Sequence, residues 1–536
     1  VCRDSLELVE SWNRYNTHNY WLAEEANTWK LLHCLYADSL TDNPFSLDSI
    51  VPDPTLSQQT LVNAYFQCES ELRLLQLLVD WLEATAAYQE KATNTAPVIS
   101  NKIHWGNTLH QLLLGSSLFN RDRNKAMVTC MDPDAPRRQK KTIHSDDQQD
   151  DSDLCKKVFT EVRCGKFNEA VSLCINAGQA WRGAVLQGWR LLHYLPKEDA
   201  NAPLEISGNP SRDLWKWCSL GVATNTGENI YYRAAVGILC GHLSSCIPAC
   251  QGNWEDLLWA HLRVQIEARV DKFLHEHHIT VNANTTPGDI LELLQDDLQV
   301  EELSLQQVFS AVNAMMDGKR ESDYQTCQRH LMLGHVREIM KDALQWLDNA
   351  EEKFIRFLAH MILVLRLMGK DPQHDIGDKV LEKYITNLIE RIEDGSIQCP
   401  ELIAFYTSNV PYQKQIDLLA ELMDHVDKSE YRQGVVKAGV NAGIDVAASG
   451  RVAIKKAITD IQKGYGNTDV TFTQTTAVEK DKTLINKVIL SLEWLSLIPN
   501  QILEGLWLSN AMIRTFIFIG NTDAASACLV MFNQMF

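Results

Sequence analysis

Apolar residues recur at helical spacing along almost the whole chain, and in several stretches they cover more than one side of the predicted helix. Within residues 71–83 two sets of apolar positions share one helix: Leu72, Leu75, Val79 and Leu82 form a stripe, and Leu74, Leu78 and Trp81 cover much of the remainder. Residues 354–368 have the same character. A helix that is apolar on two sides has to pack against a neighbour on each side. The pattern therefore predicts a stack in which each helix is covered by the ones before and after it.

Short turns that contain glycine separate many of these helices. At Gly165, Gly241, Gly334 and Gly520 an apolar helix ends, and another is predicted to begin a few residues later. Glycine adopts the left-handed conformation that ends a helix, and so short a turn makes the next helix fold back. Alternation typical of strands is nearly absent. We therefore expect an all-α fold, an irregular α-helical solenoid of hairpins without a fixed repeat period.

Composition limits the class of protein. With 536 residues, of which 45% are hydrophobic and 22% charged, the chain has enough apolar material for a folded stack. The net charge of −19 opposes the field of nucleic acid, so direct nucleic-acid binding is not expected. The longest apolar run, residues 354–368, is too short to span a bilayer and carries ionisable side chains. The 14 cysteines are scattered through helical runs, which indicates a reducing compartment.

The clearest interruption of the helical pattern lies at residues 131–153. Two prolines precede the basic run Arg137-Arg138-Gln139-Lys140-Lys141, and an acidic cluster follows from Asp146. The basic run could be a nuclear localisation signal or a nucleic-acid patch, but a solvated loop is favoured because acids follow so closely. We predict a mobile linker here and lesser loops at residues 42–57, 198–207, 281–287 and 464–478.

Two helix starts can be recognised from their caps. Asn209 followed by Pro210 predicts a capped helix with proline in its first turn, and Asn253 precedes acids at the positive end of a helix dipole. Six tryptophans fall in this region of the chain: Trp181, Trp189, Trp215, Trp217, Trp254 and Trp259. Most are expected to pack in the core, and a minority to anchor an interface.

No motif for catalysis or cofactor binding is present. Every Gly-Lys pair lacks the upstream glycine and following hydroxyl of a phosphate-binding loop. The densest set of possible ligands, His275-Glu276-His277-His278, does not reproduce the i, i+4 pair of a zinc hydrolase and is better explained as a polar helix end. Cys240, Cys246 and Cys250 lack a Cys-x-x-Cys pair, so buried thiols are favoured over a zinc site. We predict no enzyme, no cofactor and no metal site.

The tryptophan-rich region and several other motifs resemble a known family. The segments are Val79-Asp80-Trp81-Leu82-Glu83, Met131-Asp132-Pro133-Asp134-Ala135-Pro136-Arg137-Arg138-Gln139-Lys140, Ala177-Gly178-Gln179-Ala180-Trp181-Arg182, Gly188-Trp189, Gly208-Asn209-Pro210-Ser211-Arg212-Asp213-Leu214-Trp215, Trp254-Glu255-Asp256-Leu257-Leu258-Trp259-Ala260 and Asn510-Ala511-Met512-Ile513-Arg514. They are similar to the nucleoporin one-hundred-seven family of outer-ring scaffold nucleoporins. The likeness covers most of the chain.

The resemblance implies a member of the ancestral coatomer element class, whose helices run out through a trunk, turn back in a crown, return through the trunk and continue into a tail. For this chain it implies an outgoing trunk at 1–130, a linker at 131–153, a crown at 154–278, a returning trunk at 279–478 and the start of a tail at 479–536. The implied function is a structural scaffold in the Y-shaped complex of the nuclear pore at the nuclear envelope, supporting nucleocytoplasmic transport and mRNA export.

Partners follow from the same resemblance. The crown would bind the crown of a related scaffold nucleoporin, the type with mass near ninety-six kilodaltons in vertebrates. The far end of the tail would bind a β-propeller-bearing nucleoporin; because the chain ends inside a predicted helix, that contact is expected to be missing here. No direct membrane insertion is expected. For the crown surface we select apolar residues beside hairpin turns: Trp189, Leu192, Ile238, Leu243 and Ile247.

Two other functions remain open. A coat protein of secretory vesicles would share the helical class and differ in partners and location. A metal-dependent hydrolase, the more remote alternative, would use His275, Glu276 and His277 from the cluster that ends at His278.

Overall fold

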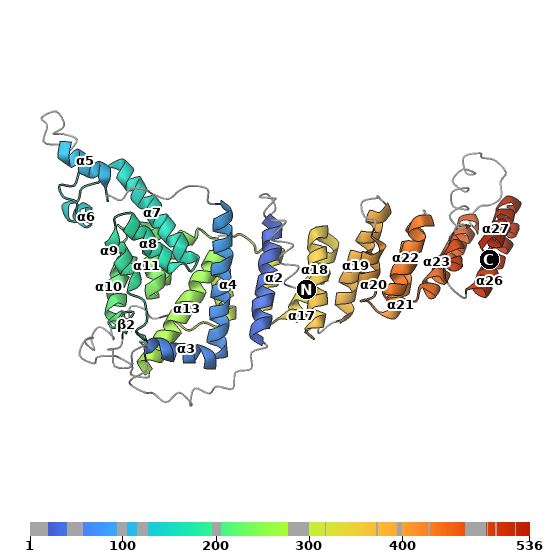
Figure 1. The fold of residues 1–536 in the computed structure, drawn as a ribbon, viewed down its shortest axis with the longest axis horizontal. Coiled ribbons are helices and arrows are strands. Elements are labelled where there is room, and N and C mark those ends of the chain that lie inside the picture. Colours follow the sequence, from blue (N-terminus) through green and yellow to red (C-terminus); the bar gives the residue numbers. More distant parts are fainter. Residues whose placement is uncertain are drawn as a thin grey trace. The chain divides into compact units, whose positions relative to one another are not determined.

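The computed structural model describes residues 20–39, 57–93, 104–114, 127–195, 205–276, 300–316, 318–370, 374–393, 399–426, 429–466, 489, 491–498, 501–519 and 521–535. Nearly all of them lie in α-helices (Figure 1), which confirms the all-α prediction. By their internal contacts the residues divide into two compact units, Val1–Gly334 and His335–Phe536. None of the segment boundaries expected from the sequence falls at this division.

The described part of the first unit contains helices and one small antiparallel sheet. Its elements are α2 (Tyr20–Ser39), α3 (Gln58–Cys68), α4 (Ser70–Thr93), α5 (Gly106–Leu114), α6 (Ala135–Gln139), α7 (Ser145–Arg163), α8 (Phe167–Asn176), α9 (Ala180–Gln187), β1 (His193–Leu195), β2 (Glu205–Ser207), α10 (Arg212–Thr224), α11 (Ile230–Cys240), the 3-10 helix η3 (Leu243–Ser245), α12 (Ile247–Cys250), α13 (Trp254–Glu276), α15 (Leu305–Met315) and α16 (Asp323–Met332). In the sheet Tyr194 pairs with Ile206. The loop predicted at 198–207 thus ends in a strand.

Helix α13 is the centre of this unit. Every residue from Leu257 to Glu267 is buried, including the polar ones. It packs against α4, α11 and α15, which lie far from one another in the sequence, and Figure 1 shows it running beside α4. The cap predicted at its start is present, because the Asn253 side chain accepts a hydrogen bond from the backbone N–H of Glu255 (2.9 Å).

The chain returns along its own first helices. Helix α16 packs against α2, and the Gln328 side chain donates to the hydroxyl of Thr28 across 2.9 Å although the two residues are 300 positions apart. The Ser322 hydroxyl, which caps α16, also donates to the Glu24 carboxylate at 3.1 Å. The prediction of a helical solenoid that folds back on itself is confirmed.

The glycine turns at Gly165, Gly241 and Gly334 lie where the sequence placed them, and Gly520 lies outside the described residues. A helix or 3-10 helix begins two residues after each of the four glycines named above, at Phe167, Leu243, Val336 and Thr522. Gly165 has a φ of +71°, and a Cβ there would lie 2.3 Å from the carboxylate of Glu83 in α4. Both the backbone conformation and the close approach require glycine at this turn.

The predicted linker at 131–153 is wrong for most of its length. Residues 145–153 form the first half of α7, and residues 135–139 form the short helix α6. The acidic run that suggested a solvated loop is the N-terminal half of a helix, where acids oppose the positive end of the dipole.

One of these acids, Asp147, joins two helices. Its carboxylate is buried and accepts hydrogen bonds from the backbone N–H groups of Asn107 (3.2 Å) and Thr108 (2.6 Å) and from both of their side chains. These backbone groups belong to the first turn of α5, where a helix has no acceptors of its own. Asp147 of α7 therefore caps α5.

The described part of the second unit is a row of paired helices. They are α17 (Val336–Asn349), α18 (Glu352–Leu367), α19 (His374–Glu393), α20 (Pro400–Thr407), α21 (Tyr412–His425), α22 (Ser429–Asn441), α23 (Val446–Gly466), α25 (Glu493–Ser496), α26 (Ile502–Ile519) and α27 (Thr522–Met535). Helix α18 is the buried helix predicted at 354–368. None of the described helices has the length and hydropathy needed to cross a membrane.

Short helix α25 joins the two hydrophobic cores of this unit. Trp494 packs into the core formed mainly by α19 to α23, while Leu492 and Leu495 pack into the core of α26 and α27. Arg432 of α22 pairs with Glu493 and lies over the ring of Trp494. Of the lesser loops predicted from the sequence, residues 42–56, 198–204, 281–287 and 467–478 lie outside the described residues. Residues 464–466 form the end of α23 and not a loop.

Replacement of Asp147 by alanine is expected to release α5 from α7. Loss of an N-cap costs about 1–2 kcal/mol, so amide hydrogen exchange in residues 106–114 should rise by roughly 5- to 30-fold while exchange in α13 stays unchanged. Asp150→Ala is the matched control, because Asp150 is exposed on the same helix. Equal exchange in the two variants would contradict the capping role.

Candidate partner interface

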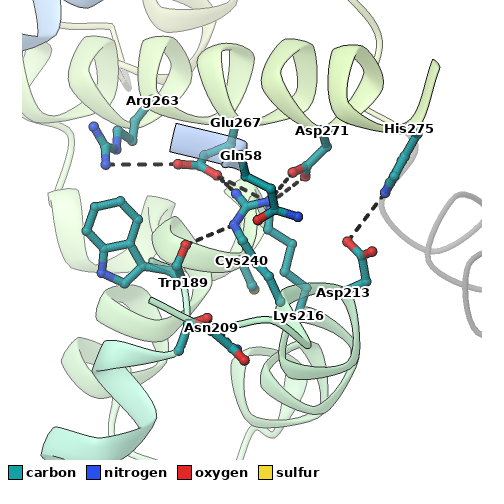
Figure 2. A network of polar contacts seen from close by, with 12 residues as sticks. Gln58, Trp189, Asn209, Asp213, Lys216, Cys240, Arg263, Glu267, Asp271 and His275 are labelled. Atoms are coloured by element: carbon teal, nitrogen blue, oxygen red, sulfur yellow. Dashed lines mark hydrogen bonds and ion pairs between the residues drawn. The ribbon is translucent and has the colours of Figure 1, made fainter. Parts of the chain in front are cut away.

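Helix α10 turns two basic side chains toward the interior of the unit. Arg212 and Lys216 meet the carboxylates of Glu267 and Asp271 on α13 (Figure 2). Glu267 accepts from Arg212 at 2.6 Å and from Lys216 at 3.2 Å, and Asp271 accepts from both. Arg212 also donates to the carbonyl of Trp189 at 2.8 Å. The four charges fix α10 on α13 and hold the turn that precedes the sheet.

Burial and ion pairing shift the pKa values of Asp271 and Arg212 in opposite directions. Burial disfavours the charged form of Asp271, but Arg212 and Lys216 outweigh it and hold the pKa of this carboxyl well below its ordinary value. Burial likewise acts against the charged form of Arg212, and the charges of Asp271 and Glu267 outweigh it and raise the pKa of the guanidinium. Asp271 and Arg212 are therefore both charged in the folded chain.

Two further contacts surround this network. The Nε2 atom of His275, in the last turn of α13, lies 3.3 Å from the carboxylate of Asp213 on α10 (Figure 2). The hydrogen bond to Asp213 raises the pKa of His275. On the other side, Arg263 lies 3.9 Å from Glu267 and stacks over the rings of Phe167 and Trp189.

The five residues selected as crown surface separate into two groups. Leu192 and Ile238 are buried, at 1% exposure each, so the prediction that solvent reaches them is wrong. Their positions beside turns are covered by neighbouring elements, since α11, which carries Ile238, packs against α7, α10 and η3. Trp189, Leu243 and Ile247 are half-buried and keep accessible surface.

Trp189 forms part of an open pocket of about 390 Å³ between α8 and the small sheet. Its ring packs on Phe167, with centroids 4.9 Å apart. The pocket also contains polar groups, among them Arg190, whose guanidinium donates to Asn168. The open pocket, with an aromatic wall and polar groups, has room for the side chain of another protein.

Two of the six tryptophans in this region are fully buried, so the prediction that most of them pack in the core is confirmed only for these two. Trp254 and Trp259 are buried, and Trp181, Trp189 and Trp215 are half-buried, whereas Trp217 is 42% exposed. The buried Trp259 donates its indole N–H to Glu83 at 3.1 Å. The half-buried Trp215 donates to the carbonyl of Val185 at 2.8 Å.

The histidines and cysteines considered as metal ligands do not form a metal site in the described part of the chain. In the part of the chain that the structure describes, no three His, Cys, Asp or Glu side chains are placed to hold a metal ion. His275 is held by Asp213, and His277 and His278 lie outside the described residues. The three cysteines of the α11–α12 region are buried free thiols, and burial raises the pKa of Cys240 to about 12, which disfavours the thiolate that a metal would need.

Glu267→Gln is expected to weaken the tie between α10 and α13. The substitution removes a buried negative charge beside Arg212 and Lys216, and breaking such a pair costs about 3 kcal/mol or more. Pulse proteolysis in urea should show earlier cleavage within residues 205–250. As a control, Glu382→Gln removes a carboxylate from an exposed pair with Lys414 and should change stability by less than about 0.5 kcal/mol. The network would be unimportant for stability if both variants behaved alike.

Comparison with known proteins places this fold in one family. The family described as "Nuclear pore protein 84 / 107" matches residues 19–535. The chain is 33% identical to "Nuclear pore complex protein Nup107" of Drosophila melanogaster over 517 residues, which cover 93% of this chain and 58% of the fly protein. It is 30% identical to the protein of the same name in Homo sapiens over 530 residues, 96% of this chain and 55% of the human protein.

A fungal relative extends the comparison. "Nucleoporin nup107" of Schizosaccharomyces pombe is 24% identical over 538 residues, 97% of this chain and 62% of the yeast protein. The chain thus spans 55–62% of the length of these relatives. Since the family match covers almost the whole chain, the chain belongs to the nuclear pore protein 84/107 family, whose members are structural proteins of the nuclear pore complex at the nuclear envelope and not enzymes.

Proposed function

We propose that the chain is a structural scaffold of the outer ring of the nuclear pore, in the Y-shaped complex, and that it supports nucleocytoplasmic transport and mRNA export. The observation that carries this proposal is the family match across residues 19–535. A folded-back helical stack suits the role because it offers long surfaces to neighbouring scaffold proteins.

The proposal divides the chain into trunk, crown and tail segments. Residues 1–130 are the outgoing trunk and residues 279–478 the returning one, and the contact of α2 with α16 supports a return of the chain to its first described helix. Residues 154–278 are the crown, and residues 479–536 begin a tail module. Since the chain spans little more than half of its animal relatives, a tail contact with a β-propeller-bearing nucleoporin is assigned to the full-length protein only.

The proposed partner is a related scaffold nucleoporin of the same helical class, bound crown to crown. Of the residues first selected for this contact, Leu243 of η3 and Ile247 of α12 remain suitable because they are half-buried apolar side chains. Trp189 remains suitable through its pocket. Neither membrane insertion nor nucleic-acid binding is part of the proposal.

The two alternative functions, a vesicle coat protein and a metal-dependent hydrolase, predict a different location and a bound metal, respectively. A coat protein of secretory vesicles would have to leave the nuclear rim, so fluorescence of the tagged full-length protein at vesicle exit sites would favour it. The hydrolase would need stoichiometric metal at the end of α13, where His275 already contacts Asp213. Elemental analysis of the purified protein decides that alternative.

The purified chain should form a one-to-one complex with the related scaffold nucleoporin in size-exclusion chromatography with light scattering. Leu243→Asp is expected to weaken the complex at least about 10-fold, because a charge would replace an apolar side chain of the proposed crown surface. Leu367→Asp serves as the control, since Leu367 is 78% exposed at the end of α18 and lies outside the crown.

Absence of any complex with the unsubstituted chain would overturn the partner assignment. Equal weakening by the Leu243 and Leu367 variants would instead contradict the crown as the binding region. Ile238 is not used in this test, because a charge at so buried a position would unfold the helix.

A further inference from the structure

Helix α10 buries two charged side chains and exposes an apolar stripe. Its buried side carries Arg212 and Lys216, which are at most 4% exposed, together with Ser219, Leu220 and Ala223. Its exposed side carries Leu214 (36%) and Trp217 (42%), together with exposed Cys218 and Gly221. A surface helix ordinarily turns its apolar stripe to the core and its charges to water. In α10 two charged residues lie on the buried side beside Leu220 and Ala223, and a second set of apolar residues is exposed.

The stripe has the shape of a helix-packing surface. Leu214, Trp217, Cys218 and Gly221 follow the spacing i, i+3, i+4, i+7, which places them on one face over two turns. A Cβ added at Gly221 would meet nothing within 4 Å, so this position is open toward the outside. A small residue beside a large one allows another helix to approach closely and to receive the ring of Trp217 alongside it.

The charges of α10 and of the whole chain limit which kind of surface can bind the apolar stripe. Arg212 and Lys216 are paired with α13, and Asp213 is held by His275, so a charged partner surface would gain little from this helix. A second copy of the chain would also bring the same net charge of −19, which opposes close association. An uncharged apolar face of a different protein fits best.

The stripe is too small to be a whole interface. The exposed part of Trp217 offers on the order of 100 Å², whereas a stable interface buries about 800 Å² on each partner. Two more exposed isoleucines flank α10 in the chain, Ile206 (63%) in β2 and Ile230 (42%) at the start of α11. Small apolar centres surrounded by polar rims are typical of binding hot spots.

We propose that the exposed face of α10, centred on Trp217 and Gly221, is the hot spot at which the crown binds an apolar helix of the related scaffold nucleoporin. This inference rests on the proposed function, since it takes its partner from there. Trp217 provides the anchor, and Gly221 provides the space for a close helix–helix approach.

Two substitutions test the anchor and the space separately. Trp217→Ala should weaken the complex at least about 10-fold, the loss expected for a hot-spot tryptophan. Gly221→Leu should weaken it similarly by blocking the approach, although leucine is the better helix former and the helix itself is not weakened. Trp507→Ala is the matched control, because Trp507 is a similarly exposed indole (62%) on α26 in the second unit.

Cys218 supplies a measurement that needs no substitution. Cys218 and Cys399 are the two exposed cysteines among residues for which the structure gives a position. Adding the purified partner nucleoporin should slow alkylation of Cys218 by a maleimide at least about 10-fold, while Cys399 reacts as before. Peptide-level mass spectrometry reports both sites in one sample.

The outcomes separate this inference from the proposed function. If the unsubstituted chain forms no complex, the proposed function fails. If the complex forms but Cys218 stays reactive and both α10 variants bind normally, the proposed function stands and the α10 surface is overturned. Protection of Cys218 in the chain alone, increasing with its concentration, would identify a second copy as the occupant and would also overturn it.

Discussion

The burial of helix α13 from Leu257 to Glu267 is the constraint on which the first unit depends. A helical segment that is surrounded on all sides cannot leave its polar groups to water, so most of them need partners from neighbouring elements. Trp259 donates to Glu83 of α4, Glu267 pairs with α10, and Gln265 bonds both the carbonyl of Glu301 and the N–H of Leu303. These bonds set how α4, α10 and the segment before α15 are placed around α13.

Features that depend on local chemistry could be predicted from the sequence. Helical period, the buried helix α18, the cap at Asn253 and the turn at Gly165 each follow from residues a few positions apart. The linker prediction failed because Asp147 finds its partners in α5, at Asn107 and Thr108. An acid that caps a distant helix cannot be told from a solvated acid by its neighbours in the chain.

The candidate surface was harder to predict for the same reason. Proximity to a turn selected Leu192 and Ile238, but their exposure is decided by elements packed over them. The sequence does contain one signal of this surface: Arg212 and Lys216 are four positions apart, as are Glu267 and Asp271. Two helices with matching i, i+4 pairs of opposite charge can pair through them.

The buried charges explain why α10 shows an apolar face to solvent. Replacing such a network by well-packed apolar residues is often neutral or stabilising, so stability alone does not account for it. Had positions 212 and 216 been apolar, the helix would have had two apolar faces, and either could have packed on α13. With Arg212 and Lys216 bound to Glu267 and Asp271, only one rotation satisfies the charges. We infer that the network fixes the rotation of α10, and that this rotation keeps Leu214 and Trp217 available for a partner.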